Sequence, residues 1–235
     1  SSDVCSSDLA KGQLVLYLFS KTDEGLFNKI EKNKSSLLKF FDDELDKRVS
    51  REIFSKTEKN ISQKIEKDHN IKVKIPFGYD LAKNIISENM NFFWLRQLDP
   101  EYEKNIYVFY EDYSKTKIDG LNKIFHSTEP DVSPLRNFIS KKFLIDSEKT
   151  NIFMDIQSIF PINYEKINLN GNLAVISKGL WKLSDISAGG PFHSITVYNS
   201  KLDRIYYIEG YVYAPGSKKR EFMQEISSIL KTFEL

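Results

Sequence analysis

The sequence is poor in cysteine: Cys5 is the single one among 235 residues. A chain with one cysteine forms no internal disulfide and has no set of thiolates for a structural zinc site. No run of apolar residues reaches the roughly 18 that a membrane-spanning helix requires, so we expect no transmembrane segment. These absences exclude a disulfide scaffold and leave the compartment open.

Motifs that carry metal or nucleotide chemistry are also missing. The chain has no His-Glu-x-x-His zinc motif, no EF-hand loop, no P-loop and no Gly-x-Ser-x-Gly elbow. We therefore predict neither a metal nor a cofactor. The formal net charge of +1 is too small to predict nucleic-acid binding.

Arginine is scarce beside lysine. A nucleotide bias toward A and T explains the many lysines and asparagines more simply than a function does, so each arginine is the more informative cation. A guanidinium binds carboxylates and phosphates through two parallel hydrogen bonds, which an ammonium cannot do. The arginines are Arg48, Arg51, Arg96, Arg136, Arg204 and Arg220.

We interpret the first segment, residues 1–9, as an artefact. Its Cys5–Leu9 part matches the translation of a common sequencing adapter. Artefactual segments do not enter the fold argument. We accordingly expect one α+β domain over residues 10–235, truncated at its N-terminus, with 10–145 and 146–235 as candidate halves.

Residue patterns predict both helices and strands. Many of the aromatic residues, 13% of the chain, lie in alternating runs, which favours a sheet. The predicted class is α+β, a mainly antiparallel sheet with helices packed on one face. Helices are expected over 23–45, 49–69, 119–125, 134–143 and 217–233, and strands over 13–19, 71–75, 92–95, 106–110, 152–160, 164–169, 173–183, 192–198 and 205–213.

Two stretches of the chain resemble each other. Phe92–Tyr113 and Leu180–Tyr213 each have an early tryptophan, a tyrosine-rich strand and a following helix. An internal duplication is one interpretation of this likeness, and chance recurrence of aromatic residues is the other.

A set of ordered motifs lies near the C-terminus. They are Gly179-Leu180-Trp181, Gly189-Gly190-Pro191-Phe192, Gly210-Tyr211-Val212-Tyr213-Ala214-Pro215 and Lys219-Arg220-Glu221. Together they resemble a lipoprotein-like family of Bacteroidota, domain of unknown function 4837, over nearly all of Gly12–Leu235. Family members typically carry an arginine where this chain has Lys178 and a methionine where it has Ala188.

The resemblance implies where the protein acts rather than what it does. It implies an extracytoplasmic parent protein that a lipid anchors through a signal absent from this chain. No activity is established for the family, so none is implied. We expect a binding or scaffold protein associated with the cell envelope.

The strongest candidate site is the start of the last predicted helix, where Ser217 is the expected cap. Lys218, Lys219 and Arg220 would fill its first turn. Each cation placed at a helix N-terminus costs about 0.3–1 kcal/mol when exposed. Two explanations are open: either Glu209 and Glu221 neutralise the cluster, or an anionic ligand does.

We expect an anion-recognition surface whose partner is an anionic glycan, a lipid headgroup or an acidic envelope protein. The Gly189-Gly190 pair is open to a second interpretation, a tight turn with positive φ. Trp181 is likewise open to interpretation as a core residue. The residues assigned to this surface are Lys218, Lys219, Arg220, Arg204, Gly189, Gly190, Phe192 and Trp181.

Other functions remain as alternatives. One is a hydrolase whose carboxylates, Glu209 and the pair Glu129 and Asp131, meet only in the fold. Another is a structural partner that uses Tyr206 and Tyr211 as an exposed contact patch. The histidines are scattered, and His69 is expected to be a cation at a helix C-terminus.

Overall fold

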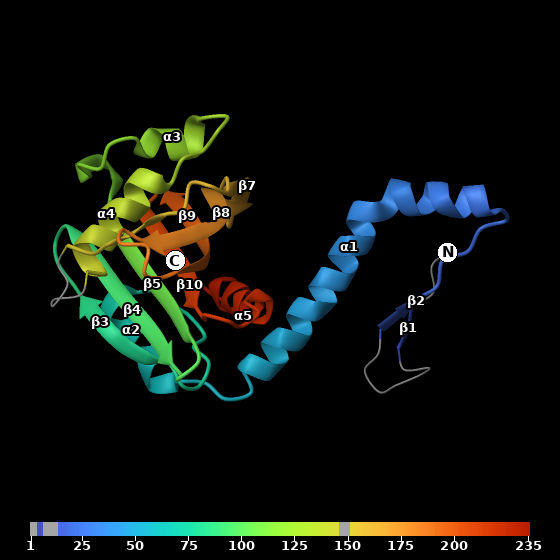
Figure 1. Cartoon of the computed structure of the whole chain (residues 1–235). Helices are drawn as coiled ribbons and strands as arrows, with labels where there is room; N and C mark the ends of the chain where they lie inside the picture. The colour runs from blue at the N-terminus through green and yellow to red at the C-terminus, as the bar shows by residue number, and fades with distance from the viewer. Residues whose placement is uncertain (1–3, 7–13, 146–150) are drawn as a thin grey trace. The chain divides into compact units, whose positions relative to one another are not determined.

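The computed structural model describes residues 4–6, 14–145 and 151–235 (Figure 1). Its contacts divide the chain into two compact units, Ser1–Arg48 and Val49–Leu235. Most of the segment interpreted as an adapter artefact lies outside the described residues.

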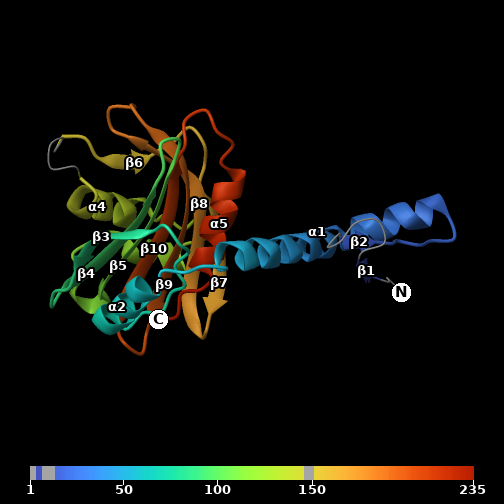
Figure 2. The ribbon, with the colours of Figure 1, turned by 90° about the horizontal axis from the view of Figure 1, so that it is seen from below.

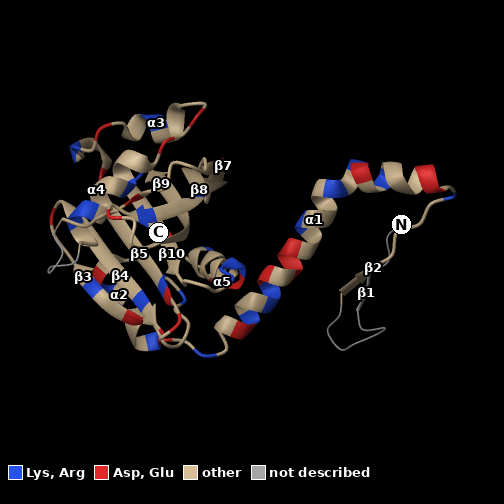
Figure 3. Cartoon of the chain, in the orientation of Figure 1, with Lys and Arg blue, Asp and Glu red and all other residues tan. Residues whose placement is uncertain are grey.

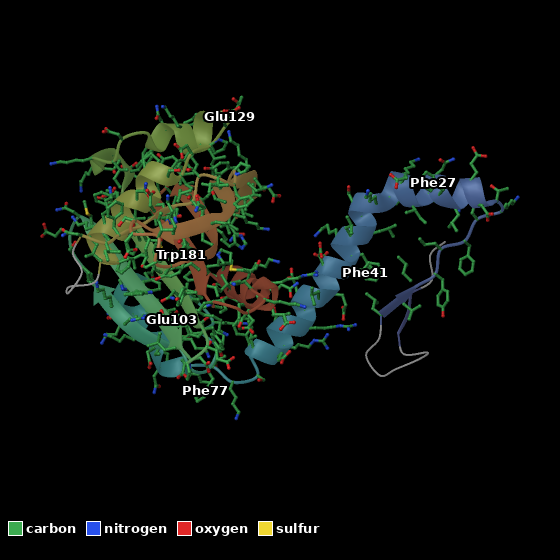
Figure 4. The ribbon with its side chains drawn as sticks, in the orientation of Figure 1. Phe27, Phe41, Phe77, Glu103, Glu129 and Trp181 are labelled. Carbon is green, nitrogen blue, oxygen red and sulfur yellow. The ribbon has the colours of Figure 1, made fainter. Side chains whose placement is uncertain are left out.

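The first unit contains a short strand pair and most of a long helix, whose residues from Val49 onward belong to the second unit. Strands β1 (Val4–Ser6) and β2 (Leu14–Leu16) pair antiparallel, and α1 spans Asp23–Ile53. Thr22 Oγ1 accepts a hydrogen bond from the Gly25 N–H at 3.1 Å, which confirms the predicted helix start. Helix α1 has no buried residue, and its Phe27 and Phe41 are exposed (Figure 4).

The break between the first two helices lies later than predicted. Helix α1 continues without interruption to Ile53, and α2 begins at Lys59 and ends at His69. The hydroxyl of Ser55 donates to the carbonyl of Glu52 at 2.7 Å and satisfies one of the last carbonyls of α1. The predicted break near residue 46 is therefore wrong.

The second unit contains an eight-stranded sheet in the order β3-β4-β5-β10-β9-β8-β6, with β7 also paired to β8. Every strand pairing is antiparallel, which confirms the predicted α+β class. The strands are β3 (Asp80–Ile85), β4 (Met90–Leu98), β5 (Glu103–Asp112), β6 (Met154–Ile156), β7 (Asn163–Leu169), β8 (Asn172–Leu183), β9 (Gly189–Asn199) and β10 (Arg204–Tyr213). The remaining helices are α3 (Leu121–His126), α4 (Ser133–Phe143), α5 (Arg220–Leu230) and the 3₁₀ turn η1 (Tyr113–Lys115).

Two predicted strands differ from the observed ones. The segment 71–75 alternates between buried and exposed residues as expected, but its ladder pairing is a single isolated bridge, Lys72 with Glu234. Pro76, directly after the segment, forms a second isolated bridge with Thr57. Strand β3 was not predicted, because Asp80–Ile85 has too few aromatic or β-branched residues to signal a strand.

Helices cover both faces of the sheet, so their predicted placement on one face is wrong. Figure 2 shows α4 and α5 on opposite sides of it. One core joins α2 and α5 to the sheet, and the other joins α3 and α4 to the opposite face. The reason lies in the central strands: β5 is buried continuously from Lys104 to Glu111, so neither of its faces meets water.

The two similar stretches meet at the centre of the sheet. Strands β3, β4 and β5 form one meander, and β8, β9 and β10 form another, joined through the β5–β10 pair. This pairing unites the candidate halves in one sheet. The helices that follow the two meanders lie on opposite faces, so the likeness between the halves is limited to their strands.

Candidate functional site

The basic residues near the C-terminus surround the first turn of α5. The helix begins at Arg220, with Lys219 as its N-cap residue, so Ser217 does not cap it. Lys218 and Arg220 are exposed and Lys219 is half-buried. Figure 3 marks basic residues on α5 in blue. Of Lys218, Lys219 and Arg220, Arg220 alone is part of the helix, and all three lie next to the free backbone N–H groups at the start of α5.

Glu209, one of the two carboxylates expected to neutralise this cluster, is committed elsewhere. It is completely buried and receives two hydrogen bonds from Arg136. Glu225 of α5 forms an ion pair with Lys104 of β5. Among the described residues, no ion pair joins any of the three cations to a carboxylate. The nearest negative charge in sequence is Glu221, which is exposed in the first turn of α5.

Arg136 and Glu209 form the most deeply buried ionic contact of the described chain. The Arg136 Nε donates to Oε2 and Nη2 donates to Oε1, each at 2.9 Å, while Tyr207 Oη donates to Oε2 at 2.6 Å. The guanidinium carbon lies 4.7 Å from the centre of the Phe192 ring. Helix α4 is thereby fixed to β10 by a geometry that lysine cannot reproduce.

The surroundings keep these groups in fixed protonation states. Burial lowers the pKa of Arg136, but the Glu209 carboxylate raises it, and the net shift is upward. Burial and the same carboxylate raise the pKa of Tyr207 and of Tyr107 well above the ordinary value. The guanidinium therefore stays charged, and the two phenols remain protonated.

A row of polar side chains crosses the sheet beside this pair. Strand register places Tyr107, Glu209, Ser194, Ser177 and Tyr164 on five neighbouring strands in one line. The hydroxyl groups of Tyr107 and Ser177 are buried without a hydrogen-bond partner in the described structure. Residues one strand apart in such a line have Cβ atoms about 5 Å apart. The period-two pattern of each strand alone did not reveal this row.

Phe192 and Trp181 are core residues rather than parts of a surface. Their exposed fractions are 1% and 4%. The Trp181 ring packs edge-on against Tyr211 with 5.4 Å between ring centres, and Figure 4 labels Trp181 among the side chains of the sheet. Of the two interpretations of Trp181, the structure therefore supports the core residue and not the surface residue.

The tight-turn interpretation of Gly189 and Gly190 is wrong. Both lie in β9 without positive φ, and the turn is formed by 184–187, where Ile186 has φ 64°. A Cβ on Gly190 would lie 2.0 Å from the carbonyl oxygen of Val212. Glycine is required there because two strand backbones approach closely.

Arg204 does not join the basic cluster. It begins β10, where its Nε lies 3.5 Å from Asp112 Oδ1. The strand extends from there to Tyr213, about 30 Å away at the usual rise per residue. The segment Gly189–Phe192 is at the same end of the sheet as α5's first turn, because Phe192 pairs with Tyr211.

The residues of the two alternative functions also lie apart. Tyr206 and Tyr211 are buried, with exposed fractions of 3% and 5%, so the predicted contact patch is not on the surface. Glu129 and Asp131 are exposed in the loop between α3 and α4, whereas Glu209 is inside the core. A carboxylate held by two guanidinium hydrogen bonds is unavailable as a hydrolase acid or base.

The lowered pKa of His69 disfavours the helix-end cation that the sequence predicted. Asn84 donates through Nδ2 to Asp68 at 2.7 Å, so its Oδ1 accepts from His69 Nε2 at 2.6 Å. The other ring nitrogen, Nδ1, is hydrogen-bonded to Tyr110 Oη at 3.2 Å. Burial lowers the pKa of His69, and it lowers that of His193 to about 4.

Two features are absent from the described ranges. No helix within 14–145 and 151–235 combines the length and the apolar character that crossing a membrane requires. In those same ranges, no three His, Cys, Asp or Glu side chains are grouped to hold a metal ion.

The antiparallel sheet with a helical layer on each face defines an α+β domain. The family model named domain of unknown function (DUF4837) matches residues 58–232, from the start of α2 to beyond α5. The chain belongs to this family.

No curated protein matches the chain. The solved structures that resemble it include a mutant of the protein Mog1 and the Ran-binding protein Mog1p of Saccharomyces cerevisiae. Each is 11% identical, with a TM-score of 0.38, and the match covers 70% of this chain and 89% of theirs. A likeness at that level carries no argument about function.

Proposed function

We propose that this DUF4837 protein is an extracytoplasmic binding protein of the cell envelope, lipid-anchored in its full-length form, that recognises an anionic group at the start of α5. The location and the anchor rest on the resemblance to the Bacteroidota lipoprotein-like family. The recognition rests on one observation: Lys218, Lys219 and Arg220 have no ion-pair partner among the described residues.

The energetics of the helix start support this proposal. Free N–H groups and the helix dipole already make the start of α5 electropositive. Adding cations there is unfavourable unless negative charge is nearby, and Glu209 is held by Arg136 instead. Phosphate and carboxylate oxygens accept hydrogen bonds from both N–H groups and cations, so an anion would satisfy both.

The buried ion pair also supports binding over hydrolysis. The hydrolase alternative needs Glu209 as one of its carboxylates. The bidentate contact with Arg136 occupies both carboxylate oxygens. Anion recognition at α5 needs no free carboxylate at all.

The proposal is tested with three probes: inorganic phosphate, polygalacturonate, and vesicles containing equal parts of phosphatidylglycerol and phosphatidylcholine. Wild type should bind at least one probe, with an affinity that falls as salt is added. The variant Lys219→Gln/Arg220→Gln should bind it roughly ten-fold more weakly or worse. The matched control, Lys74→Gln/Lys201→Gln, removes two exposed charges elsewhere and should bind like wild type. Equal affinity of the α5 variant and wild type, or no binding of any probe, would overturn the proposal.

A further inference from the structure

A cavity of about 630 Å³ lies between two segments that are distant in sequence. One is the loop that joins α3 to α4, and the other is the start of β7 with the residues before it. Figure 4 labels Glu129 in the first of these segments. The volume is within the range of small-molecule sites, about 300–1,000 Å³. The cavity is lined by Thr128, Glu129, Pro130, Asp131, Pro161, Ile162, Asn163, Tyr164 and Lys166.

The two walls are tied to each other. Lys166 Nζ donates to the carbonyl oxygen of Ser127 at 2.6 Å. Tyr164 of β7 makes hydrogen bonds with the Val132 backbone and the Ser133 side chain at the start of α4. Both contacts cross from one segment to the other, so the cavity has a fixed shape before any ligand arrives.

The lining consists mainly of acceptors and apolar surface. Glu129 and Asp131 are exposed carboxylates, and Asn163 adds an exposed amide. Lys166 is the single cation of the lining, so the lining has a net charge of −1. The Lys166 ammonium already donates to the carbonyl oxygen of Ser127. Such a lining repels anions and accepts hydrogen bonds from ligand hydroxyl groups.

The apolar part of the lining narrows the ligand class. Two proline rings and Ile162 give flat or rounded hydrocarbon surface beside the carboxylates. A sugar ring has the matching chemistry, since it presents vicinal hydroxyl groups at its edge and C–H bonds on its face. A simple cation would satisfy the carboxylates but would leave the hydrocarbon surface and most of the volume unused.

We propose that this cavity binds a neutral carbohydrate of one or two rings. Glu129 and Asp131 accept hydrogen bonds from its hydroxyl groups, and Pro130 and Pro161 contact its C–H face. This site is separate from the anion-recognition surface at α5, and its negatively charged lining disfavours the anions that the α5 surface is proposed to bind. Each site can therefore fail without affecting the other.

The test is a calorimetric titration of the whole chain with D-galactose, D-mannose, N-acetyl-D-glucosamine and their disaccharides, and with D-glucuronate and D-glucosamine. At least one neutral sugar should bind, at equal affinity in low and high salt, and D-glucuronate should bind at least ten-fold more weakly. The Glu129→Gln variant should lose about ten-fold in affinity. So should Asp131→Asn, which retains the Oδ1 that accepts from the Ser133 N–H at 2.9 Å.

Glu165→Gln is the matched control. Glu165 is an exposed carboxylate of β7 that does not line the cavity, so its loss should leave sugar binding unchanged. The thermal midpoints of all three variants should equal that of wild type. Binding of D-glucosamine alone, with an affinity that falls in salt, would identify a cation site and overturn the proposal. Absence of sugar binding at millimolar concentration, or equal affinity in the two cavity variants and wild type, would overturn it as well.

Discussion

Arg136 of α4 and Glu209 of β10 form a bidentate ion pair with no exposed surface on either side chain. The pair spans 73 residues of sequence and fixes the helical layer to the central strand of the sheet. Because Arg136 engages the Glu209 carboxylate, Glu209 does not neutralise Lys218, Lys219 and Arg220 at the start of α5.

Replacing one partner of this ion pair should lower the free energy of unfolding more than replacing both partners. Arg136→Met leaves the Glu209 carboxylate buried without a cation, which should cost about 3–5 kcal/mol in the free energy of unfolding. The double variant Arg136→Met/Glu209→Leu should cost less than the single one, because no charge is stranded. Urea denaturation of both variants measures this, and a double variant as unstable as Arg136→Met or less stable would contradict it.

Glycine at position 190 should be irreplaceable. Gly190→Ala places a methyl group against the Val212 carbonyl oxygen and should destabilise the protein by about 3 kcal/mol or more, since strand backbones cannot separate cheaply. The control is Gly171→Ala: that glycine has φ +85° and no neighbouring atom within 4 Å, so its replacement costs only the backbone strain, about 1 kcal/mol. Equal losses of stability in the two variants would contradict the steric argument.

His193 should make the protein lose stability as the pH falls. Burial, then the charges of Lys178 and Lys231, lower its pKa from 6.5 to about 4 in the folded state. Between these values the unfolded chain takes up the proton first, so stability is complete above pH 6.5 and falls by about 3 kcal/mol as the pH approaches 4.

Urea denaturation at several pH values checks this expectation. His193→Gln removes this titrating group and should reduce the dependence of unfolding free energy on pH between 6.5 and 4. His69, whose pKa is also lowered by burial, remains in the variant and contributes a slope of the same sign. Carboxylates with lowered pKa, such as Asp68 and Asp112, act at lower pH and remain in the variant. An unchanged slope in His193→Gln would show that other groups set the pH dependence.

Removing the cations at the start of α5 should stabilise the ligand-free protein. Lys219→Gln/Arg220→Gln relieves the unfavourable interaction with the helix dipole by about 1 kcal/mol at low salt. The gain should shrink as salt is added, because these charges are solvent-screened. Thermal melts at two salt concentrations measure it, and a loss of stability would show that the cations make favourable contacts within the folded chain.

Strands with a strong local pattern were predictable. The alternating aromatic residues of β4, β5, β9 and β10 predicted four strands, and these pair in the structure as two antiparallel hairpins. Strand β3 lacked such a signal and was missed. The unbroken apolar run of β5, Ile106–Tyr110, indicates burial on both faces of the strand. Such a strand requires a covering layer on each side, which the prediction of helices on a single face did not provide.

The candidate site was predictable only in part. The unusual basic run at Lys218–Arg220 could be found from sequence, because a rule of helix electrostatics applies to neighbouring residues. The scarcity of arginine pointed to Arg136 as informative but gave no partner for it. The cavity beside Tyr164 had no sequence signal, since its two walls, which end at Asp131 and begin again at Pro161, are separated by 30 positions of the chain.

The sequence by itself determined the local elements and the family, because hydrogen-bonding periodicity, turns and ordered motifs depend on residues close together in the chain. Only the tertiary structure decided that β5 pairs with β10, that helices cover both faces, and that Arg136 holds Glu209 away from the basic start of α5. These contacts join residues that are distant in the chain. They are set by the packing of whole layers, in which each buried charge must find its partner wherever the fold places it.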